Sequence, residues 1–254
     1  MSPRARILFV ALMLLIAATC VRLGLWQRSR LLGRRTRNAA AVAARALPPL
    51  TLGATDGVPL ADRRVIAHGT FDHANEMLLR QQVLSGSPGV VVVTPLRESQ
   101  GDSAVLVIRG FLPSADGLSV PQLDSLGEEG ERTISGVARP IANTFGRGQP
   151  LLRAGQVSWH ELELGALRAR LPYALRDVVI FPEPAPGDLP FPRRLDLPPL
   201  DDGPHLSYML QWFGFATIAA IMALLAVVRR RVAGWSEPTA AAPSAAAPPP
   251  PPRP

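Results

Sequence analysis

The sequence predicts a membrane protein in which two transmembrane α-helices flank an extracytoplasmic α+β domain with a mainly antiparallel sheet. Two apolar segments, residues 7–26 and 206–228, lie near the two ends of the chain. Short β-branched runs separated by turn-like residues fill the region between them, and one helical pattern comes late. Basic charge is concentrated beside the apolar segments and not in the middle of the chain.

The second apolar segment is the clearer of the two membrane spans. Residues 206–228 contain no charged side chain. At about 1.5 Å per residue they reach about 34 Å, which is enough to cross a hydrocarbon core of about 30 Å. Residues 7–26 also resemble a secretory signal peptide that would be cleaved after Ala18. We expect an uncleaved span, because apolar character continues to Trp26, a residue suited to the membrane interface.

Charges beside the second span predict the orientation. Asp201 and Asp202 precede it and residues 229–231, all arginine, follow it, so its carboxyl end should face the cytoplasm. The first span is ambiguous, since arginines lie on both sides of it. We therefore expect a multi-pass protein of the cell (inner) membrane. Its parts are a cytoplasmic segment 1–6, span 7–26, an extracytoplasmic domain 27–205 with a Pro-rich connector 182–204, span 206–228, and a cytoplasmic tail 229–254 that is basic, then Ala/Pro-rich and disordered.

The net charge of +7 does not indicate a nucleic-acid-binding protein. Residues 1–37 hold eight arginines and no acid, whereas residues 38–205 hold 15 arginines and 19 acidic residues. Nucleic acid binding requires a basic face on a folded module, and the central region is mildly acidic. The expected partner of the basic charge is the lipid bilayer.

Local patterns place the elements of the central domain. The Arg- and Ala-rich residues 27–45 favour a helix that ends before Pro48. A further helix is predicted over residues 159–171, where apolar residues recur at helical spacing. Alternating or β-branched runs predict strands at residues 64–71, 76–83, 89–96, 104–112, 132–139 and 176–181.

The sequence carries no recognisable catalytic signature, and we expect no enzymatic activity and no metal ion. It lacks a nucleophile elbow and a phosphate-binding loop, and a zinc-protease pattern beginning at His160 fails because Leu164 stands where a second histidine is needed. Cys20 is the only cysteine, so no disulfide can form within the chain.

One constellation at the start of the second span indicates a binding site. His205, Tyr208 and Trp212 are spaced i, i+3 and i+7, which places them on one side of a helix. A neutral histidine can ligate haem iron, and aromatic side chains can stack on a porphyrin. The alternative is an interfacial aromatic belt with a capping histidine.

Ordered motifs along the chain resemble the Surfeit locus protein 1 family of cytochrome c oxidase assembly factors. The first is Leu23-Gly24-Leu25-Trp26-Gln27-Arg28 at the end of the first span. Further motifs are Gly69-Thr70-Phe71, Pro88-Gly89, Thr94-Pro95-Leu96, Val107-Ile108-Arg109-Gly110-Phe111-Leu112-Pro113, Ser135-Gly136-Val137-Ala138-Arg139 and His205-Leu206-Ser207-Tyr208-Met209-Leu210-Gln211-Trp212-Phe213. Departures from the family pattern include Phe111 in place of tryptophan and Gly203-Pro204 before the histidine.

The resemblance implies a role in maturing the haem-bearing subunit of the oxidase. It implies haem a as the cofactor, with His205 as ligand and Tyr208 and Trp212 as pocket walls. Oxidase subunits, assembly intermediates and haem a synthase are the implied partners. For Arg109 and Gly110 we favour a structural role, in which Arg109 bonds a loop and Gly110 permits a bulge or a close approach. The alternative function is a two-span membrane scaffold that binds only protein partners.

Overall fold

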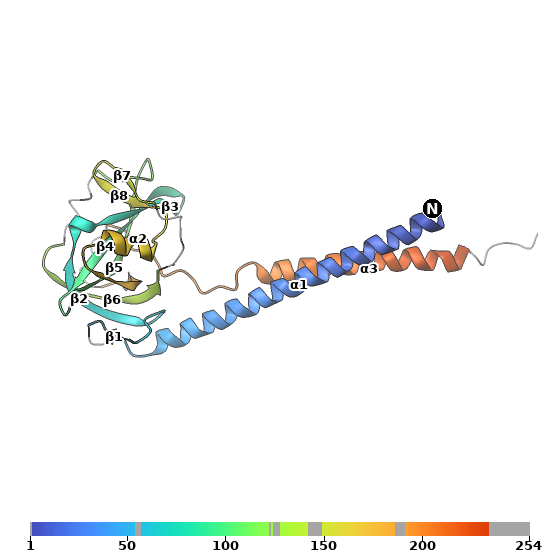
Figure 1. The fold of residues 1–254 in the computed structure, drawn as a ribbon, viewed down its shortest axis with the longest axis horizontal. Coiled ribbons are helices and arrows are strands. Elements are labelled where there is room, and N and C mark those ends of the chain that lie inside the picture. Colours follow the sequence, from blue (N-terminus) through green and yellow to red (C-terminus); the bar gives the residue numbers. More distant parts are fainter. Residues whose placement is uncertain are drawn as a thin grey trace, which may run out of the picture. The chain divides into compact units, whose positions relative to one another are not determined.

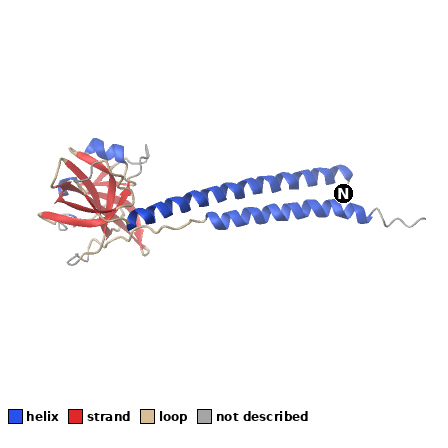
Figure 2. Cartoon of the chain, turned by 90° about the horizontal axis from the view of Figure 1, so that it is seen from below, coloured by secondary structure: helices blue, strands red, loops and turns tan. Residues whose placement is uncertain are grey.

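The computed structural model describes residues 2–53, 57–121, 123, 128–141, 149–185 and 191–233, with side chains to residue 228 in the last range. The chain divides into two compact units. We call the described parts of residues 1–35 and 202–254 the helix unit, and those of residues 36–201 the barrel unit. The chain is coloured by sequence position in Figure 1 and by secondary structure in Figure 2.

The helix unit is formed by α3 (His205–Ala233) and by α1 (Pro3–Ala46) as far as Arg35, and the last residues of α1 belong to the barrel unit. Pro3 suits the first turn of α1, and Pro48-Pro49 follow its end, as predicted. The apolar segment and the Arg- and Ala-rich stretch therefore form one continuous helix. By length and composition, both α1 and α3 are candidate membrane spans.

The barrel unit is built from nine described strands. Their bounds are β1 Leu50–Thr51, β2 Arg64–Phe71, β3 Met77–Leu84, β4 Ser87–Glu98, β5 Ser103–Pro113, β6 Glu131–Pro140, β7 Leu151–Arg153, β8 Gln156–Trp159 and β9 Ala174–Pro182. The 3-10 helix η1 (His73–Asn75) and the helix α2 (Leu164–Arg170) complete the unit. Among the described residues antiparallel pairings predominate; only β1–β2, β3–β8 and β5–β9 are parallel.

Pairing between β2 and β4 closes part of the sheet into a barrel. The strand order is β1-β2-β6-β9-β5-β4-β3-β8-β7, and the additional β2–β4 pairing joins β2, β6, β9, β5 and β4 into a ring. Gly69 on β2 allows this closure, because a Cβ atom there would lie 2.0 Å from the Arg97 carbonyl oxygen. Strands β3, β8 and β7 extend from the barrel on the far side of β4.

The central strands are buried on both faces, which explains their continuous apolar runs. Alternate residues of β5 belong to different clusters: Val105 and Val107 join the barrel interior with Val65 and Ala67 of β2. On the other face, Leu106 and Ile108 of β5 pack in a second cluster with Trp159 of β8 and Leu167 of α2, among other residues.

One predicted element is wrong in its first half. Residues 159–171 do not form a single helix, because Trp159 ends strand β8 and the helix α2 begins only at Leu164. Trp159 pairs with Leu79 of β3 and is 1% exposed. Burial in the sheet thus outweighs the helical spacing of the apolar residues. The short strands β1, β7 and β8 were not predicted.

Candidate functional site

The candidate site lies where α3 begins, opposite the end of the apolar segment of α1. His205 is the first residue of α3, and its Nδ1 atom lies 2.9 Å from Oε1 of Gln27 on α1. Deeper in the pair, a Cβ atom on Gly24 would lie 2.8 Å from the Phe213 ring. Residue numbers fall along α1 as they rise along α3, so the two helices run antiparallel (Figures 1 and 2).

Buried positions along both helices follow coiled-coil spacing. Within the helix unit they are Cys20, Gly24, Gln27 and Leu31 on α1, and Ala216, Ala219 and Ala223 on α3. Intervals that alternate between three and four residues keep one seam of each helix facing its partner. Glycine and alanine at most of these positions allow the backbones to approach closely. The seam fixes the register that brings Gln27 to His205.

The contact with Gln27 determines which nitrogen of His205 is open. An amide oxygen only accepts hydrogen bonds, so Nδ1 of His205 carries the hydrogen in this contact. In the neutral ring the lone pair then resides on Nε2. Metal-ligating histidines typically donate their other ring N–H in this way, which fixes the ring orientation and the tautomer. A histidine held in this way is suited to act as a metal ligand through Nε2.

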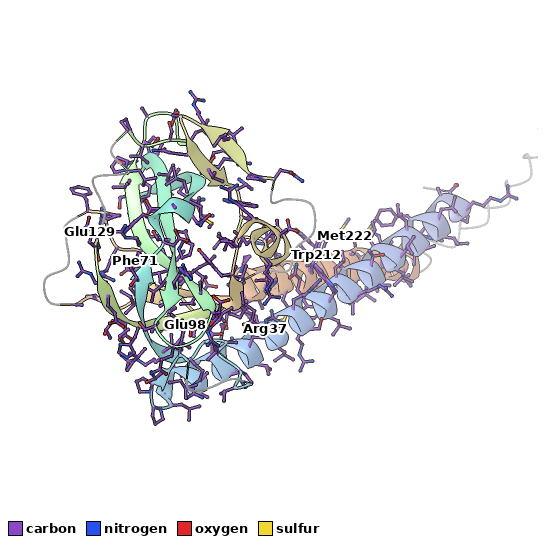
Figure 3. The ribbon with its side chains drawn as sticks, turned by 60° about the vertical axis from the view of Figure 1, so that its left-hand side comes forward. Arg37, Phe71, Glu98, Glu129, Trp212 and Met222 are labelled. Atoms are coloured by element: carbon purple, nitrogen blue, oxygen red, sulfur yellow. The ribbon has the colours of Figure 1, made fainter. Side chains whose placement is uncertain are left out.

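The structure places the two predicted aromatic residues differently. Trp212 (Figure 3) is half-buried and stands edge-on to Phe215, with ring centroids 6.0 Å apart. Tyr208 is 48% exposed and lies off the seam. His205 and Trp212 share the seven-residue interval of the seam, whereas Tyr208 lies at its margin. No described contact links the three side chains to one another.

An ion pair lies beside His205. Arg35 of α1 donates to Oδ2 of Asp202 from Nε at 2.9 Å and from Nη2 at 2.7 Å. The hydrogen bond from Arg35, aided by its positive charge, lowers the pKa of Asp202. Gly203, with a φ of 64°, makes the turn between Asp202 and α3.

Sequence reasoning missed Gln27 as the partner of His205, although Gln27 stands in one of the quoted motifs. The two residues are 178 positions apart, so no local pattern links them. It also missed Glu76 and Glu128 in the barrel unit. Nη1 of Arg109 lies 3.3 Å from Oε2 of Glu76, and Nη2 lies 3.1 Å from Oε1 of Glu128.

The contacts of Arg109, which forms the arginine cluster with Glu76, Glu128 and Phe71, agree with the structural role expected for this residue. The Arg109 side chain is 4% exposed, and its Cζ atom lies 5.2 Å from the centroid of the Phe71 ring. Thr94 donates a further hydrogen bond to Glu76. Gly110 also acts as expected, because its φ of 147° and a Cβ position 2.6 Å from the Arg193 carbonyl oxygen leave room only for glycine. There the connector pairs with β5 through two backbone hydrogen bonds between Phe111 and Arg193.

A cleft of about 490 Å³ opens beside the arginine cluster. Phe71 and Glu129, both labelled in Figure 3, line it together with Arg109, Glu128, Arg132 and Arg194. The lining is polar and carries both signs of charge. Among the described residues, no group of three or more His, Cys, Asp or Glu side chains is arranged to hold a metal ion.

Two antiparallel apolar helices joined to a closed, sheet-rich domain define a class of protein with paired candidate membrane spans and a single globular unit. The chain belongs to the SURF1 family, whose model matches residues 14–217. This family is linked to cytochrome oxidase assembly and is not a catalytic one.

Curated relatives agree with the family assignment. The chain is 30% identical over 189 residues to a SURF1-like protein of Monosiga brevicollis, covering 67% of each chain. It is also 30% identical over 183 residues to an uncharacterised SURF1-like protein of Mycobacterium bovis, covering 69% of this chain and 66% of the relative. A SURF1-like protein of Mycobacterium tuberculosis matches over the same shares. The alignments thus span about two thirds of each relative.

Proposed function

We propose that this protein is a cytochrome c oxidase assembly factor that holds haem a while the haem-bearing subunit matures. Helices α1 and α3 anchor it in the cell membrane as two spans, and the barrel unit is extracytoplasmic. The observation that carries the proposal is the His205–Gln27 contact at 2.9 Å, formed by residues of two separate family motifs. That contact leaves Nε2 of His205 as the ligand atom.

The ends of α3 support the orientation. Asp201 and Asp202 precede the helix, and Arg229, Arg230 and Arg231 lie at its other end. Arginines near a span favour the cytoplasmic side. A reporter fused after Arg153, in the barrel unit, is expected to be active only outside the cytoplasm, and a reporter fused after Arg231 only inside. The opposite result would overturn the proposed topology.

Haem is the cofactor for which the site is proposed, and it would supply the iron that His205 binds. The chain's own part is to present Nε2, to hold the ring through Gln27 and to place Trp212 about two turns deeper on the same side of α3. Trp212 offers a flat apolar wall beside this position. Tyr208, at the margin, is suited to contact a porphyrin edge or a partner at the membrane interface.

Absorption spectroscopy of the full chain purified from cells that make haem a tests the proposal. We expect a Soret band in the wild type that is lost in His205→Ala and weakened in Gln27→Ala, because Gln27 holds the ring. His160→Ala is the matched control, since His160 is an exposed histidine of the barrel unit and should leave the band unchanged. A band that survives in His205→Ala would reject this ligand.

A protein-only scaffold is the second candidate function. The cleft beside Arg109, with its mixed charges, favours it, because such a surface suits a polar protein segment better than a porphyrin. A colourless purified protein that carries oxidase subunits or haem a synthase would support the scaffold.

Deletion of the gene gives a further test of the leading proposal. We expect the oxidase of such cells to lack haem a, while other respiratory complexes stay intact.

A further inference from the structure

We propose that Arg22, Trp26 and Arg30 of α1 form a binding site for the phosphate of an anionic phospholipid. This inference rests on the membrane insertion included in the proposed function. The three residues are spaced i, i+4 and i+8 in an unbroken helix. Each step of four residues turns the helix by about 40° and rises about 6 Å, so the side chains form one stripe.

The stripe faces away from the partner helix. Trp26 is 50% exposed, and Arg22 and Arg30 are exposed, whereas Gly24 and Gln27 on the seam are buried. A seam residue and a stripe residue therefore lie on different sides of α1. In a bilayer the stripe is presented to lipid.

The chemistry of the stripe matches a lipid headgroup. Trp26 ends the apolar segment, which is the level where tryptophan accumulates in membrane proteins. The Cζ atom of Arg30 lies 5.4 Å from the centroid of the Trp26 ring, so its guanidinium is held at that level. Arg22 lies about one turn deeper, where a charge requires an anion or a route to the interface. Its long side chain can snorkel toward Trp26.

An anion bound by these two guanidinium groups would come from outside the described residues. None of the described carboxylates pairs with Arg22 or Arg30, whereas Arg35 on the same helix pairs with Asp202. Arginine binds phosphate oxygens through parallel N–H donors. The phosphate of an anionic phospholipid is the anion available at this depth, and its acyl chains would lie along the exposed apolar side chains of α1.

Native mass spectrometry of the full chain in detergent, titrated with phosphatidylglycerol or phosphatidylcholine, tests the site. We expect the wild type to retain phosphatidylglycerol in preference to phosphatidylcholine. Arg22→Gln and Arg30→Gln should each weaken that retention about fivefold, the effect of one arginine near an anionic membrane surface. Arg28→Gln is the matched control, because Arg28 is exposed at a similar depth but lies about 160° away from Trp26 around the helix.

Three outcomes would overturn the site. They are equal retention of the two lipids, an Arg28→Gln effect as large as that of Arg30→Gln, and the loss of a bound oxidase subunit without loss of lipid in the stripe variants. The last outcome would make the stripe a protein-docking face. Failure of the underlying membrane insertion is recognised separately, since alkaline carbonate would then release the wild-type protein from membranes.

Discussion

The helix unit and the barrel unit both contain buried or half-buried polar residues from family motifs, but they use them differently. In the barrel unit, Arg109 is surrounded by Glu76, Glu128 and Phe71. In the helix unit, His205 has one described partner, Gln27, and keeps its second ring nitrogen open. Motif residues in the barrel unit are thus enclosed by charged and aromatic partners, whereas in the helix unit a motif residue keeps an atom with which it could bind the proposed cofactor. The contacts of each side chain distinguish the two roles.

The largest expected effect comes from breaking the arginine cluster. Arg109→Met leaves the carboxylate of Glu76, whose side chain is 6% exposed, without its buried cation. Loss of one partner of a buried ion pair typically costs about 3–5 kcal/mol. Urea unfolding of the full chain in detergent, followed by far-ultraviolet circular dichroism of the sheet, measures this loss.

A second variant separates the charge effect from packing. Glu76→Gln combined with Arg109→Met removes the uncompensated charge and should recover part of the lost free energy of unfolding. Arg153→Met is the exposed control, with a side chain 54% exposed, and should change stability little. If Arg109→Met lowers the Soret band without lowering stability, the cluster belongs to the binding function, and the proposed division between the units is wrong.

Gly110→Ala is expected to have the next largest effect. The new Cβ atom would lie 2.6 Å from the Arg193 carbonyl oxygen at a φ of 147°. Relief requires the connector to leave β5, which breaks the two Phe111–Arg193 hydrogen bonds. A strained backbone of this kind typically costs about 1–3 kcal/mol. Limited proteolysis should show faster cleavage between Arg193 and Leu200.

Gly165→Ala provides the matched control for this substitution. Gly165 lies in the first turn of α2, and a Cβ atom there would meet no heavy atom within 4 Å. Alanine favours a helix over glycine by up to about 1 kcal/mol, so the control should be neutral or stabilising. Equal proteolysis of Gly110→Ala and Gly165→Ala would mean that the connector is not held at Gly110.

The central strands could be predicted from the sequence because their own residues favour the extended conformation. Residues 89–96 and 104–112 carry dense β-branched side chains, and the structure has strands at Ser87–Glu98 and Ser103–Pro113. Barrel closure was beyond prediction, because it depends on the backbones of Gly69 and Arg97 meeting across the fold. Trp159 was misplaced for a similar reason, since its pairing with β3 is non-local.

In the candidate site, too, local sequence predicted one residue and missed another whose role depends on a non-local contact. His205 was predicted from its own motif and helix spacing, and it lies at the start of α3. Gln27 was not predicted as part of the site, because its contact with His205 depends on the register of two antiparallel helices. Small residues such as Gly24 and Ala216 set that register through close packing. The spacing of these small residues reveals the register only once the partner helix is known.

The smallest expected effect is in the helix unit, at the exposed ion pair beside His205. Arg35 lowers the pKa of Asp202 through a hydrogen bond and its charge. A carboxyl group whose pKa is lower in the folded state adds stability above its unfolded pKa of about 3.9, and that stability is lost as pH falls through the lower folded value. The pair should therefore contribute at neutral pH and cease to contribute in strong acid.

Arg35→Gln tests this prediction by thermal unfolding of the full chain at several pH values. We expect a small decrease in melting temperature at pH 7 that vanishes as the pH falls below the folded-state pKa of Asp202, because the protonated carboxyl group no longer needs the cation. Salt should reduce the difference at pH 7, since both side chains are exposed. A difference that stays constant across pH would show that Arg35 acts through packing. In that case Arg35 would have a structural role like that of Arg109 in the barrel unit.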